Sequence, residues 1–549
     1  MIKPIDLGLP SRFKEFRPNQ LEIIQRAAGS GHYAYLVDAP PGTGKSLIGV
    51  AVHEITKMDA EEAEVWAEIS DKDLNDYKKR TIYITRTKQL QEQLLETFPK
   101  ARTIMGRRNY PCNLLGRWPE VTADDCPQEG KKEDRPMQCL SCAYNSAKFQ
   151  ALRAPIAVLN TAYYLTEING PGQFSRCRLL IVDEVDTLEN ELMNFIQFTV
   201  SERSLKRLEI RPPQGDKSQL KTWLTWAADI DYQLGRYMMD ISDAMPGSET
   251  KWGDIELELN RKLKRLGNFR TKLAQFVNQV NANWVFSESM EKNEKSWTFK
   301  PVMVADYANA YLWQFADRVL GMSGTILDPH TVAGEVGLKD FGYERLQSQF
   351  PLENRPIYFW PAVNLTRGTM QEELPKLSDA VARIMAQYPS TKILVHTTSY
   401  PIRNYLQQQF EEYNPAAGRR GRVLTHDSTN RLEMLEAFKE SDKPLVMLSP
   451  SFDRGVDLPD NICQCVIICK VPYLSMGDPQ VAARMKLPGG QQWYLLKAVQ
   501  TMIQMSGRAV RSPTDKCTTY ILDKQFNALK ARTRQIIPGW WLDAIQNMG

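Results

Sequence analysis

The chain has 549 residues, of which 42% are hydrophobic and 24% charged, and its formal net charge at pH 7 is +4. This length exceeds what one hydrophobic core supports, and the composition is typical of soluble globular proteins. No apolar run approaches the roughly 20 residues of a transmembrane helix, and the N-terminus lacks a signal-peptide core, so we expect a cytoplasmic protein without a membrane partner. The small net charge does not by itself indicate nucleic-acid binding, so that inference has to come from motifs.

Residues 39–46, with the sequence APPGTGKS, follow a short apolar run and open into a segment that can continue as a helix. The order of strand, glycine-rich turn and helix is what a phosphate-binding loop requires, although Ala39 replaces the usual first glycine. Lys45 would reach the β- and γ-phosphates of ATP, and the Ser46 hydroxyl would bind Mg²⁺. The residues expected to bind the nucleotide here are Pro41, Gly42, Thr43, Gly44, Lys45 and Ser46.

Two polar residues, Arg17 and Gln20, precede this loop at the start of a predicted helix. They stand where their side chains could hydrogen-bond an adenine edge and select ATP. The same residues also suit an ordinary helix start with solvated polar side chains, and the sequence alone does not distinguish the two interpretations.

Strands alternate with helices along this part of the chain, which predicts parallel βαβ units. A strand over residues 81–85 ends in Thr85 and is followed by Arg86 and by an amphipathic helix that extends to about Phe98. Ligands of such sheets bind at the carboxyl ends of the strands, so Thr85 and Arg86 should lie at a binding edge.

A later apolar strand ends in two adjacent carboxylates, Asp183 and Glu184, which is the Walker B arrangement. Asp183 would hold the Mg²⁺ shell, and Glu184 would polarise the attacking water. Acidic residues often end strands, but together with Lys45 they strongly indicate nucleotide hydrolysis.

Four cysteines interrupt the alternating pattern between residues 105 and 155. Cys112, Cys126, Cys139 and Cys142 have the spacing C-x13-C-x12-C-x2-C among basic and polar residues. Four thiolates can hold either a tetrahedral zinc ion or an iron–sulfur cluster, and the spacing alone favours neither. Unliganded thiols are a weaker alternative. The remaining five cysteines suit buried structural positions.

A second interruption extends from Thr187 to Trp297 and contains the longest helical pattern in the chain, an apolar stripe over residues 259–280. Basic residues alternate with this stripe, and five tryptophans fall in the same segment. Aromatic and basic side chains together can bind single strands by stacking, but we favour a hydrophobic core with a solvated face. The five tryptophans are Trp223, Trp226, Trp252, Trp284 and Trp297.

A second α/β series occupies the C-terminal part of the chain and lacks a phosphate loop. A strand there is followed by residues 453–457, which include Gly455 and Asp457, and a later helix carries Gln504 with two arginines, Arg508 and Arg511. Arginines three positions apart lie on one helix face, as a pair that contacts a γ-phosphate must. A guanidinium suits the charge that develops on phosphoryl oxygens in the transition state.

This ordered set resembles the XPD/DinG type of superfamily 2 helicases, the iron–sulfur branch of 5′-to-3′ DNA helicases, over nearly the whole chain. The segments that carry the resemblance are Arg17/Gln20, the loop 39–46, Thr85-Arg86, the four cysteines, Asp183-Glu184, Ser323-Gly324-Thr325, the strand end 395–400, Gly455/Asp457 and Gln504-x-x-Gly507-Arg508-x-x-Arg511.

The resemblance implies a 4Fe–4S cluster on the four cysteines and a helical Arch domain in the second interruption. It also implies that Gly455 and Asp457 contact the nucleotide, and that Thr85, Arg86, Arg107, Arg108, Thr397 and Ser399 contact the DNA strand. One residue departs from the family motif: Asp186 replaces a histidine that helps connect the nucleotide state to the strand-binding side. The resemblance therefore does not carry that coupling contact over.

We expect an α/β fold with two RecA-like parallel-sheet domains and two insertions in the first. The expected segments are 1–104, 156–188 and 299–330 for the first RecA-like domain, 105–155 for the four-cysteine domain, 189–298 for the Arch-like insertion and 331–549 for the second RecA-like domain. ATP would bind between them, with Lys45, Asp183 and Glu184 on one wall and Gln504, Arg508 and Arg511 on the other.

The predicted function is an ATP-dependent DNA helicase or translocase that moves 5′-to-3′ on single-stranded or forked DNA as a monomer. RNA–DNA hybrids are a further candidate substrate. Two alternatives remain: an ATPase that remodels nucleic-acid–protein complexes without separating strands, and a zinc-stabilised nucleic-acid-binding scaffold with weak ATPase activity.

Overall fold

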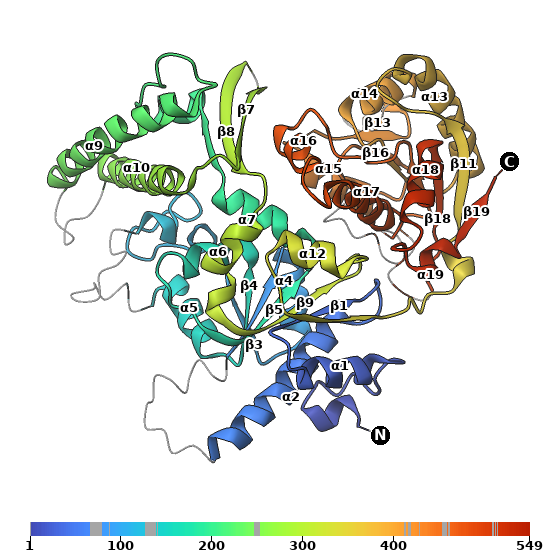
Figure 1. Ribbon diagram of the computed structural model, residues 1–549, viewed down its shortest axis with the longest axis horizontal. Helices are drawn as coiled ribbons and strands as arrows, with labels where there is room; N and C mark the ends of the chain where they lie inside the picture. Colours follow the sequence, from blue (N-terminus) through green and yellow to red (C-terminus); the bar gives the residue numbers. More distant parts are fainter. Residues whose placement is uncertain are drawn as a thin grey trace.

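The structure, a computed structural model, describes residues 2–548 apart from 66–79, 87, 127–138, 140, 246–252, 292, 411–412, 415–418, 428, 453–457, 459–461, 508–509, 511 and 513. Two sheet domains lie side by side, and an elongated insertion projects from the first of them (Figure 1). In the described part of the chain, no helix is long and apolar enough to cross a membrane.

The first RecA-like domain is built on a seven-stranded parallel sheet. Its strand order is β10 (Phe341–Arg345), β1 (Ala34–Asp38), β9 (Ala316–Ser323), β5 (Cys177–Asp183), β2 (Thr81–Thr85), β4 (Ile156–Asn160) and β3 (Ala101–Ile104). The helices of this domain are α1 (Gln20–Gly29), α2 (Lys45–Val65), α4 (Lys88–Thr97), α5 (Ala143–Arg153), α6 (Thr161–Ile168), α7 (Leu188–Ile196), α11 (Ala305–Tyr311) and α12 (Pro329–Glu335).

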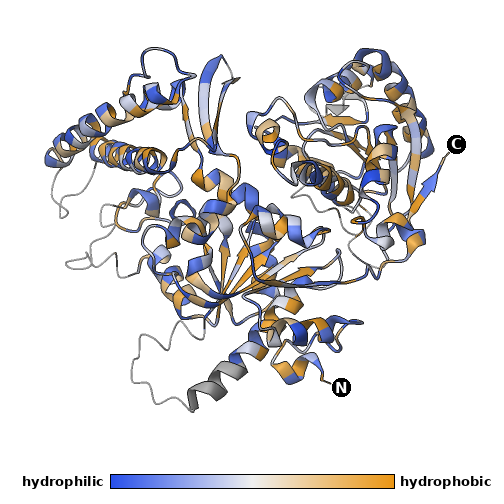
Figure 2. Ribbon diagram, in the orientation of Figure 1, coloured by the Kyte–Doolittle hydropathy of each residue, from blue (hydrophilic) through white to orange (hydrophobic). Residues whose placement is uncertain are grey.

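Successive residues of these strands face opposite sides of the sheet, and both sides are buried. Leu36 and Val182 belong to one hydrophobic cluster, whereas Val37 and Ile181 belong to another that includes α1 and α2. Continuous apolar runs such as residues 179–182 are typical of strands covered on both faces. Figure 2 shows the same pattern as hydrophobic strands between helices with mixed surfaces.

We expected a helical insertion after Walker B, over residues 189–298, but the insertion contains a small sheet as well as helices. Its helices are α8 (Glu202–Leu208), α9 (Leu220–Asp243) and α10 (Asp254–Gln279). The predicted long helix is α10, and it packs antiparallel against α9. The insertion also contains a three-stranded antiparallel sheet. The strands of this sheet are β6 (Phe198–Ser201), β8 (Glu294–Pro301) and β7 (Trp284–Glu291). The sheet forms because alternate residues of β8, such as Trp297 and Phe299, are buried against the helices.

The tryptophans of this insertion form its core, as predicted. Trp223 and Trp297 are 0% and 1% exposed, and their ring centroids lie 5.5 Å apart. Trp226 and Trp284 are buried as well, while Trp252 lies outside the described residues. These four rings are therefore not available to stack on a nucleic-acid strand.

The second RecA-like domain also contains a seven-stranded parallel sheet, so the predicted fold class is confirmed. Its strand order is β15 (Val423–Thr425), β16 (Val446–Ser449), β12 (Ile393–His396), β17 (Cys465–Ile468), β18 (Thr518–Asp523), β11 (Ile357–Val363) and β19 (Ile545–Asn547). Its helices are α13 (Met370–Gln387), α14 (Tyr400–Gln409), α15 (Arg431–Glu440), α16 (Pro479–Arg484), α17 (Gly490–Ser506), α18 (Gln525–Thr533) and α19 (Gly539–Leu542), and a short hairpin pairs β13 (Tyr413–Asn414) with β14 (Arg419–Arg420).

The boundary expected between residues 330 and 331 is wrong. Residues 341–345 form β10, which pairs in parallel with β1 and so completes the first sheet. Arg345 also forms a 2.9 Å ion pair with the buried Asp38 at the end of β1. The first RecA-like domain therefore extends to Arg345, and the connection to the second domain begins after it.

Candidate nucleotide site and interdomain contacts

The glycine-rich loop connects β1 to α2, which begins at Lys45. Gly42 and Gly44 have φ angles of 79° and 80°, a left-handed conformation that side chains with a Cβ disfavour. The Thr43 hydroxyl donates to the Pro40 carbonyl at 2.7 Å and holds the turn closed. This is the strand–loop–helix geometry that a phosphate-binding loop requires, with backbone N–H groups at a helix N-terminus.

The Gln20 side chain hydrogen-bonds the backbone of this loop. Its side-chain amide donates to the Thr43 carbonyl at 3.0 Å, and its oxygen accepts from the backbone N–H of Arg17 at 3.0 Å. The residue is only 1% exposed. Gln20 thus supports the phosphate loop, a role that its position in the sequence did not reveal, and contact of Arg17 and Gln20 with adenine stays a prediction.

The Walker B carboxylates follow β5, beside the loop. Asp183 is 7% exposed, and burial raises its pKa to about 6, although the nearby Lys45 charge opposes the shift. The Tyr83 hydroxyl lies 3.5 Å from Asp183 and also hydrogen-bonds Ser46, so this tyrosine links the two groups expected to bind Mg²⁺. Tyr83 was missed from the sequence because it occupies an ordinary strand position.

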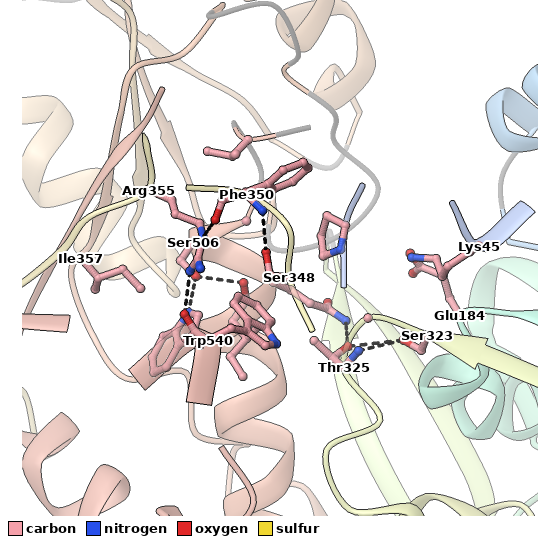
Figure 3. A pocket seen from close by; sticks show the side chains of 17 residues that line it. Lys45, Glu184, Ser323, Thr325, Ser348, Phe350, Arg355, Ile357, Ser506 and Trp540 are labelled. Atoms are coloured by element: carbon pink, nitrogen blue, oxygen red, sulfur yellow. Dashed lines mark hydrogen bonds between the residues drawn. The ribbon is translucent and has the colours of Figure 1, made fainter. Parts of the chain in front are cut away.

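A cleft between the two RecA-like domains contains Lys45 and Glu184 on one side and Gln504 and Gly507 on the other. Figure 3 shows Lys45, Glu184, Ser323 and Thr325 on one side of this pocket and Arg355, Ser506 and Trp540 on the other. Arg508, Arg511, Gly455 and Asp457 lie outside the described residues, so their contacts with a nucleotide stay predictions.

Phe350, Arg355 and Trp540 are among the residues of this cleft that were not predicted from the sequence. Phe350, in the connection between the domains, packs on the phosphate loop: a Cβ on Gly42 would lie 2.0 Å from the end of its ring. Arg355 donates to the Trp540 carbonyl at 2.7 Å, and its guanidinium lies 5.3 Å from the Trp540 ring centroid. An aromatic residue in a linker carries no local pattern, and only the tertiary structure brings it to the site.

Asp186, the residue that departs from the family motif, connects the two domains directly. Its carboxylate accepts hydrogen bonds from the hydroxyls of Ser323 at 2.6 Å and Thr325 at 2.9 Å. It also accepts from the Gln504 amide of the second domain at 3.1 Å, and the same amide donates to the Thr325 hydroxyl at 2.8 Å. Asp186 is 1% exposed, so these bonds form away from water. An interdomain contact thus exists at the position where the family histidine is absent.

The residues expected to contact a nucleic acid are only partly accessible. Thr85 is buried at the end of β2, and the next side chain, Arg86, lies 3.5 Å from Glu191. Arg107 stacks 4.4 Å from the Tyr144 ring centroid, and Arg108 pairs with Asp124 at 3.0 Å. Arg108 nevertheless keeps 85% of its side chain exposed and can reach a phosphate from this position.

The corresponding strand end in the second domain has an unusual backbone. Thr398 follows β12 with a φ of 57°, which is rare for a β-branched residue. Among the described residues, the shielded hydroxyls of Thr398 and Ser399 have no hydrogen-bond partner, while the Thr397 hydroxyl donates to the Ser399 carbonyl at 3.3 Å. Strained backbone and unpaired hydroxyls are typical of ligand-binding positions.

The four cysteines lie within one loop-rich segment. The Cys126 thiol and two backbone N–H groups hydrogen-bond the Cys112 sulfur and lower the pKa of Cys112 to about 6, although burial opposes the shift. Cys139 and Cys142 share a turn, in which the N–H of Cys142 donates to the Cys139 carbonyl at 3.3 Å. Asn113 joins the two halves through a 2.8 Å bond to the Ser141 carbonyl.

This donor set suits either metal centre considered from the sequence, because thiolates and backbone N–H···S bonds are what both zinc and iron–sulfur sites use. Within the described residues, however, no three His, Cys, Asp or Glu side chains converge closely enough to hold a metal ion. The cluster on these four cysteines stays a prediction.

Comparison with known proteins gives two helicase domains in the expected order. Residues 17–217 match the DEAD/DEAH box helicase family, and residues 381–544 match the helicase C-terminal domain family. The chain is 29% identical to the 3′-5′ exonuclease DinG of Bacillus subtilis over 62% of its own length and 39% of that protein's. It is 24% identical to the ATP-dependent DNA helicase YoaA of Haemophilus influenzae, over 94% of this chain and 92% of that protein.

Solved structures agree on the fold. A structure titled XPD_Helicase superimposes with a TM-score of 0.62 at 16% identity, over 96% of this chain and 98% of the other. The chain therefore consists of a DEAD/DEAH box helicase domain followed by a helicase C-terminal domain, and it is similar to the DinG and YoaA proteins in sequence and to XPD_Helicase in fold.

Proposed function

We propose that this protein is an ATP-dependent DNA helicase or translocase that moves 5′-to-3′ on single-stranded DNA. The observation that carries the proposal is the interdomain cleft, in which Lys45 of the phosphate loop and Glu184 of Walker B face the helix that carries Gln504. The resemblance to named DNA helicases supports DNA as the substrate, and the polarity rests on the family resemblance alone.

In this proposal ATP binds with its phosphates on residues 41–46, and Mg²⁺ is held by Ser46 and Asp183. Glu184 orients the attacking water, and Arg508 and Arg511 stabilise the charge on the γ-phosphate in the transition state. Glu184 suits this role because it lines the cleft with Lys45 and has a φ of 55°, a strained backbone of the kind found at active sites.

Hydrolysis would be coupled to movement by closure and opening of the cleft. The hydrogen bonds from Gln504 to Asp186 and Thr325 support this step, because they join the second domain to the residues that follow Walker B and the end of β9. On the strand side, Arg86, Arg108 and the Thr397–Ser399 turn would contact the DNA backbone.

The thiolates of Cys112, Cys126, Cys139 and Cys142 would hold a 4Fe–4S cluster, which would stabilise a segment that has little hydrophobic core. This structural role fits the small cluster of buried residues there, which consists of Cys112, Val121 and Leu257. We further propose a monomer in the cytoplasm or nucleoid, with RNA–DNA hybrids as a secondary substrate.

Unwinding by anaerobically purified protein tests the proposal. Forked, 5′-tailed and 3′-tailed duplexes would be compared at saturating ATP, with strand-stimulated ATP hydrolysis measured in parallel. We expect unwinding of the forked and 5′-tailed substrates only. Translocation without strand separation would favour a remodelling ATPase, and zinc-loaded protein without strand-stimulated turnover would favour a binding scaffold.

A further inference from the structure

One face of the C-terminal half of α17 contacts the first RecA-like domain. Lys497, Gln500 and Gln504 are spaced three and four residues apart, which puts them in one stripe of the helix. Gln500 donates to the Thr325 carbonyl at 2.8 Å, and Gln504 bonds Asp186 and Thr325 as described above. The position of α17 against the first domain therefore decides where Gln504 lies in the cleft.

Four charged side chains meet at the N-terminal part of this stripe. Glu189 of α7 and Glu335 of α12 belong to the first domain, and Arg484 of α16 and Lys497 of α17 belong to the second. Lys497 lies 2.8 Å from Glu335 and 3.6 Å from Glu189, and Arg484 contacts Glu189 directly and lies 3.7 Å from Glu335. We call these four residues the interdomain charge cluster.

The interdomain charge cluster is shielded from solvent although it spans two domains. The exposed fractions of its side chains are 6% for Glu189, 1% for Glu335, 4% for Arg484 and 11% for Lys497. The Arg484 guanidinium also lies 4.1 Å from the Trp493 ring centroid, at the start of α17. Burial raises the pKa of Glu335 to about 7 against the opposing charges of Lys497 and Arg484, and each cation lies within 4 Å of both carboxylates.

Such a cluster selects one arrangement of the domains more than it strengthens their contact. When the cleft opens, all four charges return to water, so pairing recovers little net free energy beyond the cost of dehydration. A closed arrangement shifted by one helical position would instead bury a charge without its partner, which is strongly unfavourable. Only the arrangement in which both cations meet both carboxylates closes without that penalty.

We propose that the interdomain charge cluster sets the position of α17 against the first domain in the closed state, and so positions Gln504 in the nucleotide cleft. Lys497 and Arg484 are positioning residues in this view and do not touch the nucleotide. The inference rests on the proposed ATP hydrolysis in the cleft, but it makes a separate claim about which closed arrangement forms.

Replacement of Lys497 by Met tests the proposal, because it removes one charge and keeps most of the side-chain volume. Lys148→Met is the matched control: Lys148 pairs with Glu167 at 2.9 Å, with exposed fractions of 11% and 5%, entirely within the first domain. Both variants leave a buried glutamate short of a partner, so both should lower the thermal unfolding temperature.

The rate of strand-stimulated ATP hydrolysis distinguishes Lys497→Met from Lys148→Met. We expect Lys497→Met to lower kcat about 10-fold or more while the KM for ATP changes less than about threefold, the pattern of an interaction made in the transition state. Lys148→Met should keep kcat within about twofold, and Lys497→Arg, which retains the charge, should restore most of it. Equal kcat values for Lys497→Met and Lys148→Met would overturn the proposal, as would a loss confined to KM.

Small-angle X-ray scattering provides a readout that does not need hydrolysis. With a non-hydrolysable ATP analogue and single-stranded DNA, the wild type and Lys148→Met should give the same radius of gyration, and Lys497→Met a larger one. A wild type without ATPase activity would contradict the proposed function alone. An unchanged radius of gyration in Lys497→Met would contradict the positioning role alone.

Discussion

The Asp186 carboxylate accepts a 3.1 Å hydrogen bond from the Gln504 side chain across the boundary between the two RecA-like domains. The same carboxylate holds the hydroxyls of Ser323 and Thr325, so three donors converge on one buried acceptor. A carboxylate can accept all three bonds at once, whereas a neutral imidazole offers one acceptor nitrogen. This explains how an aspartate can replace the family histidine and still connect the nucleotide cleft to the second domain.

Asp186→Ala should therefore uncouple the domains. Two hydroxyls and one amide lose their acceptor, and we expect the free energy of unfolding to fall by about 1–3 kcal/mol, with a larger loss of strand-stimulated than of basal ATP hydrolysis. Thermal unfolding and ATPase assays with and without single-stranded DNA measure this. Asp186→Asn, which retains one oxygen acceptor, is the matched comparison. If the alanine variant keeps wild-type stimulation by DNA, Asp186 is not part of the coupling contact.

Lys45→Ala should abolish ATP hydrolysis and leave DNA binding intact. Lys45 lies in the cleft beside Glu184 and Asp183, whereas the proposed strand contacts lie on other strand ends and on the insertions. ATPase assays and equilibrium binding to labelled single-stranded DNA measure the two properties on the same preparation. Lys14→Ala, at an exposed position outside the cleft, is the control. Continued turnover in the Lys45 variant would contradict the assignment of the phosphate loop.

Arg508→Ala and Arg511→Ala should each lower turnover more than ATP affinity. An arginine that meets the γ-phosphate acts mainly on the transition state, and its removal can cost on the order of 10³-fold in kcat. Steady-state kinetics combined with binding of a non-hydrolysable analogue separates the two effects. Parallel losses of affinity and turnover would instead indicate binding of the ground state.

Cys112→Ser should remove the brown colour of the purified protein and loosen the four-cysteine segment only. The phosphate loop belongs to a separate sheet, so basal ATP hydrolysis should survive better than duplex unwinding. Iron and sulfide assays, ATPase and unwinding on the same variant test this together. Colourless wild-type protein with stoichiometric zinc would exclude an iron–sulfur cluster, and normal unwinding by the variant would exclude its role.

His53 should make the first RecA-like domain sensitive to acid. Burial, reinforced by the charge of Arg178, lowers its pKa to about 3, and Nδ1 lies 2.7 Å from the Thr81 hydroxyl. In the unfolded chain His53 is protonated below about pH 6.5, whereas in the folded chain it is protonated only below about pH 3. The free energy of unfolding should therefore fall by about 1.4 kcal/mol per pH unit below pH 6.5 from this residue alone.

Urea unfolding at pH 7 and pH 5 of the wild type and His53→Gln measures this slope. The variant should lose about 2 kcal/mol less than the wild type over that interval. Equal slopes for the wild type and His53→Gln would show that His53 does not control the acid response.

The sequence by itself was sufficient for the elements whose signals are local. The phosphate loop, the strand that ends in Asp183 and the long helix over residues 259–280 each depend on a few neighbouring residues, and all three lie where they were predicted. Backbone geometry and hydrophobic period determine such segments before any long-range contact forms.

The tertiary structure alone decided the features made by residues distant in the chain. It assigned β10 to the first sheet, because Phe341–Arg345 pair with a strand some 300 residues earlier. It brought Phe350 onto Gly42 and joined Asp186 to Gln504 and Glu335 to Lys497. None of these pairs has a local sequence pattern. A buried polar side chain is stabilised by its hydrogen-bond or ion-pair partner, and the packing of whole domains determines which residue becomes that partner.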